Sequence, residues 1–137
     1  LKSISTYQVY EYLCEKFPDL KDVLKNGFID KHENKSVGVF LAPSTRNLPN
    51  MALGGPDCTT VKMLPVNILL HWTRNQKDCS EKANEVFDVL LCQDANFTVG
   101  DTKYAYIDLL DPCPIGLDRD ERGICEQSIR ANFYYYC

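Results

Sequence analysis

The last third of the chain places the strongest constraint on its fold. An apolar run over residues 104–110 is followed by a charged turn over 116–123 and then by a segment of regular alternation. A period of two over about a dozen residues is typical of a strand with one buried face. We therefore predict two β-strands joined by an exposed turn. The expected inward and outward residues of the second strand are Cys125, Ile129, Ala131, Phe133 and Tyr135 against Glu126, Ser128, Arg130, Asn132 and Tyr134.

Five consecutive charged residues lie in that turn, and we call them the charged tip. Five charges in succession are not accommodated in a core, and exposed connections on rigid strands are common contact sites. Interleaved arginines offset the acidic residues, so the pattern does not fit a Ca²⁺ loop. We predict that the charged tip is an interface; its members are Asp118, Arg119, Asp120, Glu121 and Arg122.

The final tyrosines must divide between the two faces of the last strand. Alternation directs Tyr135 inward and Tyr134 and Tyr136 outward. Outward tyrosines either pack under a helix or mark a subunit interface, where tyrosine is enriched. We therefore include Tyr134 and Tyr136 among the candidate interface residues.

The first half of the chain contains one helical pattern and two short strand patterns before a long loop. Apolar residues at helical spacing predict a helix over 5–17, with Ser5 and Gln8 forming a capping box. Runs at 27–31 and 36–42 flank a polar stretch and predict a hairpin. Residues 43–60, rich in proline and glycine, are expected to form an irregular loop.

The second half begins with the strongest strand pattern, over residues 63–73. The next helix is expected to begin at a cap formed by Asp78 or Ser80. Two more strands, 97–99 and 102–110, flank a glycine turn. The predicted apolar stripe of the helix is Ala83, Val86, Phe87, Leu90 and Leu91.

These elements predict an α+β fold in a single domain, 1–137, with a mostly antiparallel sheet of about five or six strands packed against two helices. The net charge of −4 argues against a nucleic-acid-binding protein, which needs a basic face. No apolar run approaches the roughly 18–20 residues that cross a bilayer. We therefore expect neither a membrane nor a specific nucleic acid among the partners.

Seven cysteines leave two redox environments open. None forms a C-x-x-C pair, so the usual zinc-ligand spacing is missing. Cys14, Cys92 and Cys125 lie on apolar sides of predicted elements, where a free cysteine behaves as a small hydrophobe. The alternatives are a reduced intracellular protein and a secreted, disulfide-stabilised binding module.

The sequence contains no concentrated set of catalytic residues. His71 is expected to be a partly buried histidine with a partnered ring, and His32 to be exposed in a turn. Cys58 lies in a loop of small and polar residues and is the best candidate for a reactive thiol, so a small cysteine-dependent enzyme is a rival interpretation. We predict no catalytic residue, cofactor or metal site.

The second half of the chain contains a series of short motifs in a fixed order. They are a Pro-Val-x-Ile-Leu strand at 65–69, Thr-Arg-Asn at 73–75, the helix at 82–90, Asn-Phe-Thr-Val-Gly at 96–100, and a Pro-x-Pro-Ile-Gly stretch at 112–116. The most specific feature is an Asp-Glu-x-Gly turn at 120–123 followed by Glu-x-Ser at 126–128. With these motifs, about residues 63–136 resemble the minor capsid or tail-terminator proteins found at the head–tail junction of tailed phages and phage-tail-like particles.

The resemblance implies a structural protein and not an enzyme. Such proteins are expected to form a ring, commonly of six subunits, that caps the tail tube, halts tube polymerisation and offers a surface to the head connector. The implied partners are other copies of the chain, the tail tube protein, connector or neck proteins and, in a contractile tail, the sheath. The implied location is the tail neck of a virion assembled in the bacterial cytoplasm. A neighbouring neck or head-completion protein is the alternative within the same particle.

Overall fold

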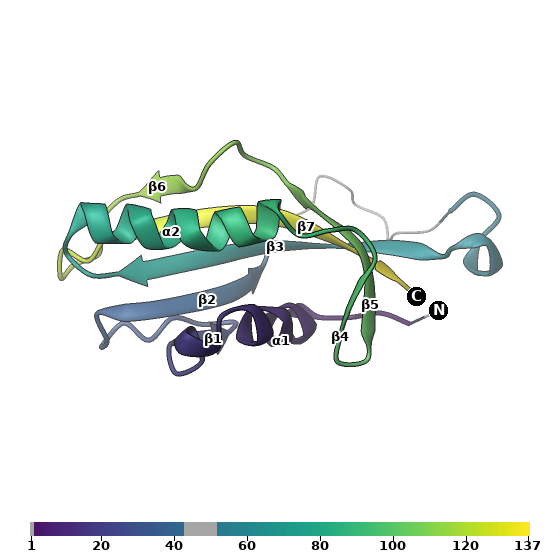
Figure 1. Ribbon diagram of the computed structural model, residues 1–137, viewed down its shortest axis with the longest axis horizontal. Helices are drawn as coiled ribbons and strands as arrows, with labels where there is room; N and C mark the ends of the chain where they lie inside the picture. Colours follow the sequence, from purple (N-terminus) through teal and green to yellow (C-terminus); the bar gives the residue numbers. More distant parts are fainter. Residues whose placement is uncertain (1, 43–51) are drawn as a thin grey trace.

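The computed structural model describes residues 2–42 and 52–137 and has the predicted α+β architecture, with two α-helices and a mostly antiparallel sheet (Figure 1). The fold class is therefore confirmed. In chain order the elements are α1 (Thr6–Lys16), the 3₁₀ turn η1 (Pro18–Leu20), β1 (Leu24–Asn26), β2 (Lys35–Leu41), the 3₁₀ turn η2 (Pro56–Cys58), β3 (Val61–Trp72), α2 (Gln76–Leu91), β4 (Phe97–Val99), β5 (Thr102–Leu109), β6 (Ile115–Leu117) and β7 (Glu126–Tyr136).

The two longest strands, β3 and β7, form the centre of the sheet. The strand order is β1-β2-β3-β7-β5-β4, and the short β6 also pairs with β7. The β3–β7 register runs without interruption from Val61–Tyr136 to His71–Glu126. All pairs are antiparallel except β1 with β2. The uninterrupted register of this central pair determines which residues of β3 and β7 lie opposite each other at each end of the pair.

Both helices pack on one face of the sheet and build the hydrophobic core there. The strand residues of this face alternate with those of the opposite face, which we call the open face and which points away from both helices. The predicted inward set of β7 is buried, which confirms that part of its alternation, but Ser128, which was predicted to face outward, is buried as well. The core includes Val9, Tyr12 and Leu13 from α1, Val86, Phe87 and Leu90 from α2, and Val39, Ile68, Ile129 and Phe133 from the strands.

The caps show why each helix begins where it does. In α1, Ser5 and Gln8 form the predicted capping box. In α2, the cap is Asn75 rather than Asp78 or Ser80, because the Asn75 side-chain oxygen accepts from the backbone N–H of residue 77 at 3.0 Å. The helix therefore starts earlier than predicted.

The prediction that Leu91 belongs to the apolar stripe of α2 was also wrong. Leu91, the last residue of the helix, is 62% exposed, because it follows buried Leu90 directly and its side chain therefore points in a different direction around the helix axis.

The predicted strand at 27–31 and its hairpin are wrong. The first strand is β1, and it runs parallel to β2, with Leu24 opposite Val37. The segment after β1 instead passes close to Gly38 of β2, where a β-carbon would lie only 2.6 Å from the carbonyl oxygen of Phe28. Glycine at position 38 thus permits a backbone crossing in place of a hairpin.

Part of the predicted loop at 43–60 lies outside the described residues, which exclude 43–51. The described part, 52–60, forms a projection beyond the end of the sheet that we call the arm (Figure 1). Its own hydrogen bonds hold it together: the Thr59 hydroxyl donates to the Gly55 carbonyl at 2.9 Å and accepts from the Ala52 N–H at 3.0 Å. The arm is therefore an ordered structure.

Candidate interface sites

The charged tip lies where β3 ends and β7 begins, and Asp120 gives it its shape. The Asp120 carboxylate accepts from the backbone N–H groups of Arg122 at 2.9 Å and Ile124 at 2.8 Å. The Gly123 N–H returns to the Asp120 carbonyl at 3.0 Å, with Gly123 at a positive φ of 79°. An aspartate that bonds its own backbone two residues on is a common turn device. Asp120 therefore has a structural role inside the tip.

Two arginines fasten the charged tip to neighbouring segments. Arg122 donates to the Lys31 carbonyl at 2.7 Å and to the Asn34 side-chain oxygen at 2.8 Å. Arg119 donates to the Arg74 carbonyl at 2.9 Å. The tip thus connects the loop before β2 with the loop between β3 and α2. The predicted exposure of the tip is confirmed for every member except the partly buried Asp120, but this fastening was not predicted.

A buried histidine lies beneath the tip. His71 has no exposed surface; its Nδ1 is 3.4 Å from a Glu126 carboxylate oxygen and its Nε2 is 3.2 Å from the Glu33 carbonyl. An Asp120 carboxylate oxygen lies 3.6 Å from the same Nε2. Because oxygen acceptors face both nitrogens, any N–H that the ring carries has a partner. His71 is more deeply buried than predicted, and its ring is partnered as expected.

The surroundings of Asp120 favour its ionised form. Partial burial of the carboxyl acts to raise its pKa, but hydrogen bonds from the Ile124 and Arg122 N–H groups, with attraction to His71 and the Arg122 guanidinium, outweigh burial and lower the pKa of Asp120. The charge of Asp120 is thus tied to the geometry of the turn.

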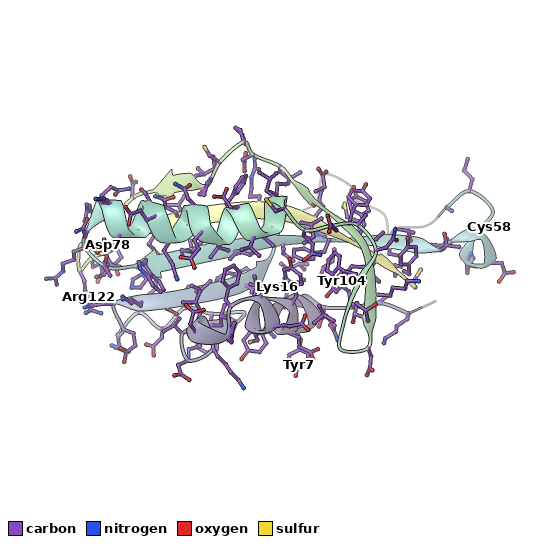
Figure 2. The ribbon with its side chains drawn as sticks, in the orientation of Figure 1. Tyr7, Lys16, Cys58, Asp78, Tyr104 and Arg122 are labelled. Atoms are coloured by element: carbon purple, nitrogen blue, oxygen red, sulfur yellow. The ribbon has the colours of Figure 1, made fainter. Side chains whose placement is uncertain are left out.

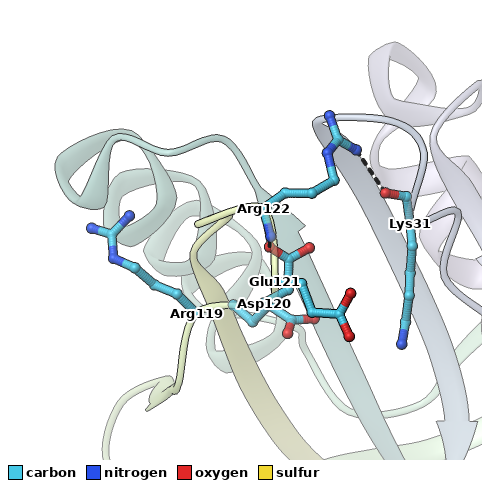
Figure 3. Close-up of a pocket in the computed structure, with 6 residues that line it drawn as sticks. Lys31, Arg119, Asp120, Glu121 and Arg122 are labelled. Carbon is cyan, nitrogen blue, oxygen red and sulfur yellow. Dashed lines mark hydrogen bonds between the residues drawn. The ribbon is translucent and has the colours of Figure 1, made fainter.

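A depression of about 370 Å³ lies against the tip, and its lining carries equal numbers of basic and acidic residues (Figure 3). A balanced lining does not favour a strongly charged small ligand. It suits complementary pairing with another protein surface, where mixed charges fix register and specificity more than affinity. The lining residues are Lys31, Arg119, Asp120, Glu121, Arg122 and Glu126.

The two outward tyrosines lie at the other end of β7, and with Tyr106 they form what we call the tyrosine patch. Tyr134 stacks on Tyr106 with ring centroids 4.4 Å apart and an angle of 11°. The Tyr136 hydroxyl donates to the Asn96 side-chain oxygen at 2.5 Å, and Lys103 lies 5.2 Å above the Tyr136 ring. Tyr135 is buried, so the predicted division of the three tyrosines is confirmed. Tyr134 packs on a neighbouring strand and not under a helix.

Sequence reasoning missed Tyr106 because of a break in the pattern of β5. Tyr104 lies opposite Tyr135, and Tyr106 lies opposite Tyr134, so β5 advances two residues while β7 advances one. Such a β-bulge moves the following side chains to the other face. Strict alternation places Tyr104 and Tyr106 together, whereas the bulge leaves Tyr104 buried and Tyr106 45% exposed.

The structure therefore divides the predicted interface residues into two sites. The five tip residues gather at one end of the β3–β7 pair, and Tyr134 and Tyr136 lie near the other. The ten-residue rise of β7 from Glu126 to Tyr136 separates these ends by about 33 Å. Arg122 marks the tip end in Figure 2, and Cys58 in the arm marks the opposite end. These seven residues do not form one patch.

All seven cysteines are free thiols. Cys79 and Cys125 are buried, whereas Cys92 is exposed, contrary to its predicted apolar placement. Burial raises the pKa of the Cys79 thiol to about 11. Within residues 2–42 and 52–137, no group of three or more His, Cys, Asp or Glu side chains is arranged to hold a metal ion, and no helix has the length and hydropathy needed to cross a bilayer.

Comparison with known proteins gives no family assignment, because no protein-family model and no curated protein matches the chain.

Proposed function

We propose that this chain is a structural protein that assembles with copies of itself into a closed ring, and that the ring caps the tail tube at the head–tail junction of a phage or phage-tail-like particle. The observation that carries the proposal is the separation of two chemically unlike surfaces at opposite ends of one rigid strand pair. A head-to-tail ring needs two different complementary patches on every subunit.

The chemistry of the two surfaces suits this role. The charged tip offers guanidinium and carboxylate groups whose backbone is already held by hydrogen bonds, so little ordering entropy is lost on contact. The tyrosine patch offers broad, rigid rings with polar ends, a composition enriched at protein interfaces. One end supplies register and the other supplies contact area.

The remaining parts of the proposal come from the family resemblance. The partners are the tail tube protein and the connector or neck proteins, with the sheath added in a contractile tail. The site of action is the neck of the particle. The protein acts by shape and contact, without turning over a substrate.

Reversing charge in the tip tests the proposal, and the structure dictates which residues to change. Asp120 is left intact because it closes the turn. The double variant Asp118→Lys, Glu121→Lys alters exposed carboxylates that form no hydrogen bond or ion pair with the described residues. We expect a folded protein whose ring formation is reduced about tenfold or more, because like charges replace complementary ones.

A matched control keeps the change in net charge the same. Asp88→Lys, Asp94→Lys reverses two exposed acids on and just after α2, away from the tip. Native mass and electron microscopy of both variants report assembly, and thermal unfolding reports folding. Normal rings from the tip variant rule out the tip as a contact, and equal loss in both variants indicates a general charge effect.

A further inference from the structure

The arm carries the most exposed large apolar side chain among the described residues. Leu53 is fully exposed although the arm around it is ordered by the hydrogen bonds of Thr59 and by the turn in which the Cys58 N–H donates to the Gly55 carbonyl at 3.1 Å. Its base is fixed as well, since the Cys137 N–H donates to the Thr60 carbonyl at 3.1 Å. An ordered projection that displays a leucine has the form of an insertion element.

An aromatic groove lies elsewhere on the same molecule, beside edge strand β1. It has a volume of about 520 Å³, and its apolar lining includes Tyr7, Tyr10 and Phe28. Tyr7 and Phe28 are 51% and 54% exposed, and Tyr7 lies 6.0 Å from Tyr10 between ring centroids. Figure 2 shows Tyr7 on the α1 side of the molecule and Cys58 in the projecting arm. The groove and the arm are therefore separate surfaces.

The charges of the arm and the groove are complementary. The described arm carries a single ionisable acid, Asp57, and no basic residue. The groove is lined by Lys21 and Lys25 against one acid, Asp22, which leaves it with a net positive charge. Neither lysine nor Asp57 forms an ion pair with another of the described residues. A leucine beside a net charge of −1 thus matches aromatic rings beside a net charge of +1.

We propose that the arm of one copy docks in the aromatic groove of the next copy, with Leu53 between the rings of Tyr7 and Phe28 and Asp57 facing Lys21 and Lys25. This inference rests on the proposed function, because it supplies a subunit contact for the ring. The contact joins two different surfaces, so it is heterologous and propagates head to tail until the ring closes. Exposed aromatic side chains with a charged rim have the composition of an interface hot spot.

A charge swap tests the pairing directly. Asp57→Lys alone and Lys21→Glu, Lys25→Glu alone are each expected to weaken self-association about tenfold, measured by sedimentation velocity. Mixing the two variant proteins brings a lysine arm against an acidic groove and is expected to restore association to within about threefold of the wild-type chain, because attraction is recovered at that contact. Failure of the mixture to recover overturns the proposed pairing.

A second substitution tests the apolar part of the contact. Leu53→Asp places a charge among the aromatic rings and is expected to weaken association about a hundredfold. The matched control is Leu91→Asp at the exposed end of α2, which is expected to change association less than twofold. Equal effects of the two substitutions contradict a specific role for the arm.

The outcomes separate this inference from the proposed function. Rings that form normally from the Leu53 and Asp57 variants overturn the arm contact and leave the ring proposal intact. A wild-type chain that stays monomeric at about 1 mM also overturns the arm contact. In that case the location of the protein at the tail neck, observed in particles by antibody labelling, decides the proposed function independently.

Discussion

The two ends of β7 are built on the same strand register but are held by different forces. At the tip end, Glu126 of β7 lies opposite His71 of β3, and the surrounding contacts are hydrogen bonds from charged side chains to backbone groups. At the other end, Phe133 packs edge-on against Tyr12 and Tyr104, and most contacts are between rings. A single strand pair therefore presents one surface shaped by directional polar contacts and another shaped by packing.

This difference predicts different sensitivities at the two ends. Ring packing depends on volume and loses free energy when a cavity forms. The polar end depends on satisfied donors and acceptors, so it loses free energy when a partner is removed or protonated. Substitutions at each end therefore test the comparison.

The largest effect is expected from Phe133→Ala at the tyrosine end. Phe133 is fully buried, and its removal leaves a cavity between Tyr12 and Tyr104. The free energy of unfolding is expected to fall by about 3–5 kcal/mol, as for other buried Phe→Ala changes. Urea denaturation measures this loss. If Phe133→Ala lowers the free energy of unfolding by less than a substitution at the tip end does, the proposed contrast between the two ends is contradicted.

The next effect is expected from His71→Ala at the tip end. Removing the imidazole leaves the Glu33 carbonyl and the Glu126 carboxylate without this partner. The free energy of unfolding is expected to fall by about 1–3 kcal/mol, because a fully buried side chain and its two hydrogen-bond contacts are lost. His32→Ala is the control, because His32 is exposed and its loss is expected to leave the denaturation curve unchanged.

A smaller effect is expected from Tyr106→Ala on the open face. The stack with Tyr134 is partly exposed, so its loss is expected to lower the free energy of unfolding by about 0.5–1.5 kcal/mol. Conservative replacement by Phe keeps the ring and serves as the control. Equal stability of the Ala and Phe variants contradicts a stabilising role for the stack.

The smallest effect is a local one at the tip under acid. The pKa of Asp120 is lowered in the folded protein, so its ionised carboxylate stabilises the turn above the unfolded pKa of about 3.9, and this contribution is lost as the pH falls through the lower folded pKa. Hydrogen exchange at the Arg122 and Ile124 N–H groups is expected to lose protection in that range. In Asp120→Asn this pH dependence is expected to vanish, whereas protection that is equally acid-sensitive in both proteins contradicts the assignment.

Sequence alone predicted the elements whose pattern is local. The inward-facing residues of β7 and the capping box at Ser5 depend on neighbours in the chain, and both are confirmed. The strand at 27–31 failed because its fate depends on a distant residue, Gly38, which lets that segment cross β2. The prediction of the α2 cap was wrong because Asp78 and Ser80 are as good N-cap residues as Asn75 when only the local sequence is considered.

The candidate sites divide in the same way. The exposure of the charged tip follows from its charge density, whereas its fastening by Arg122 to Lys31 joins residues 91 positions apart and leaves no local signal. The tyrosine patch required the bulge in β5 that brings Tyr106 beside Tyr134. The aromatic groove combines residues of α1 with Phe28, and Phe28 lies in the segment 27–31 that was wrongly predicted to be a strand.

The most direct test of the ring proposal is the mass and shape of the assembly, followed by its position in a particle. Electron microscopy with native mass measurement is expected to show closed rings of about 94 kDa, which corresponds to six chains of 15.7 kDa, seated at the neck end of a tail tube. Antibody label found only away from the neck of such particles contradicts the central claim.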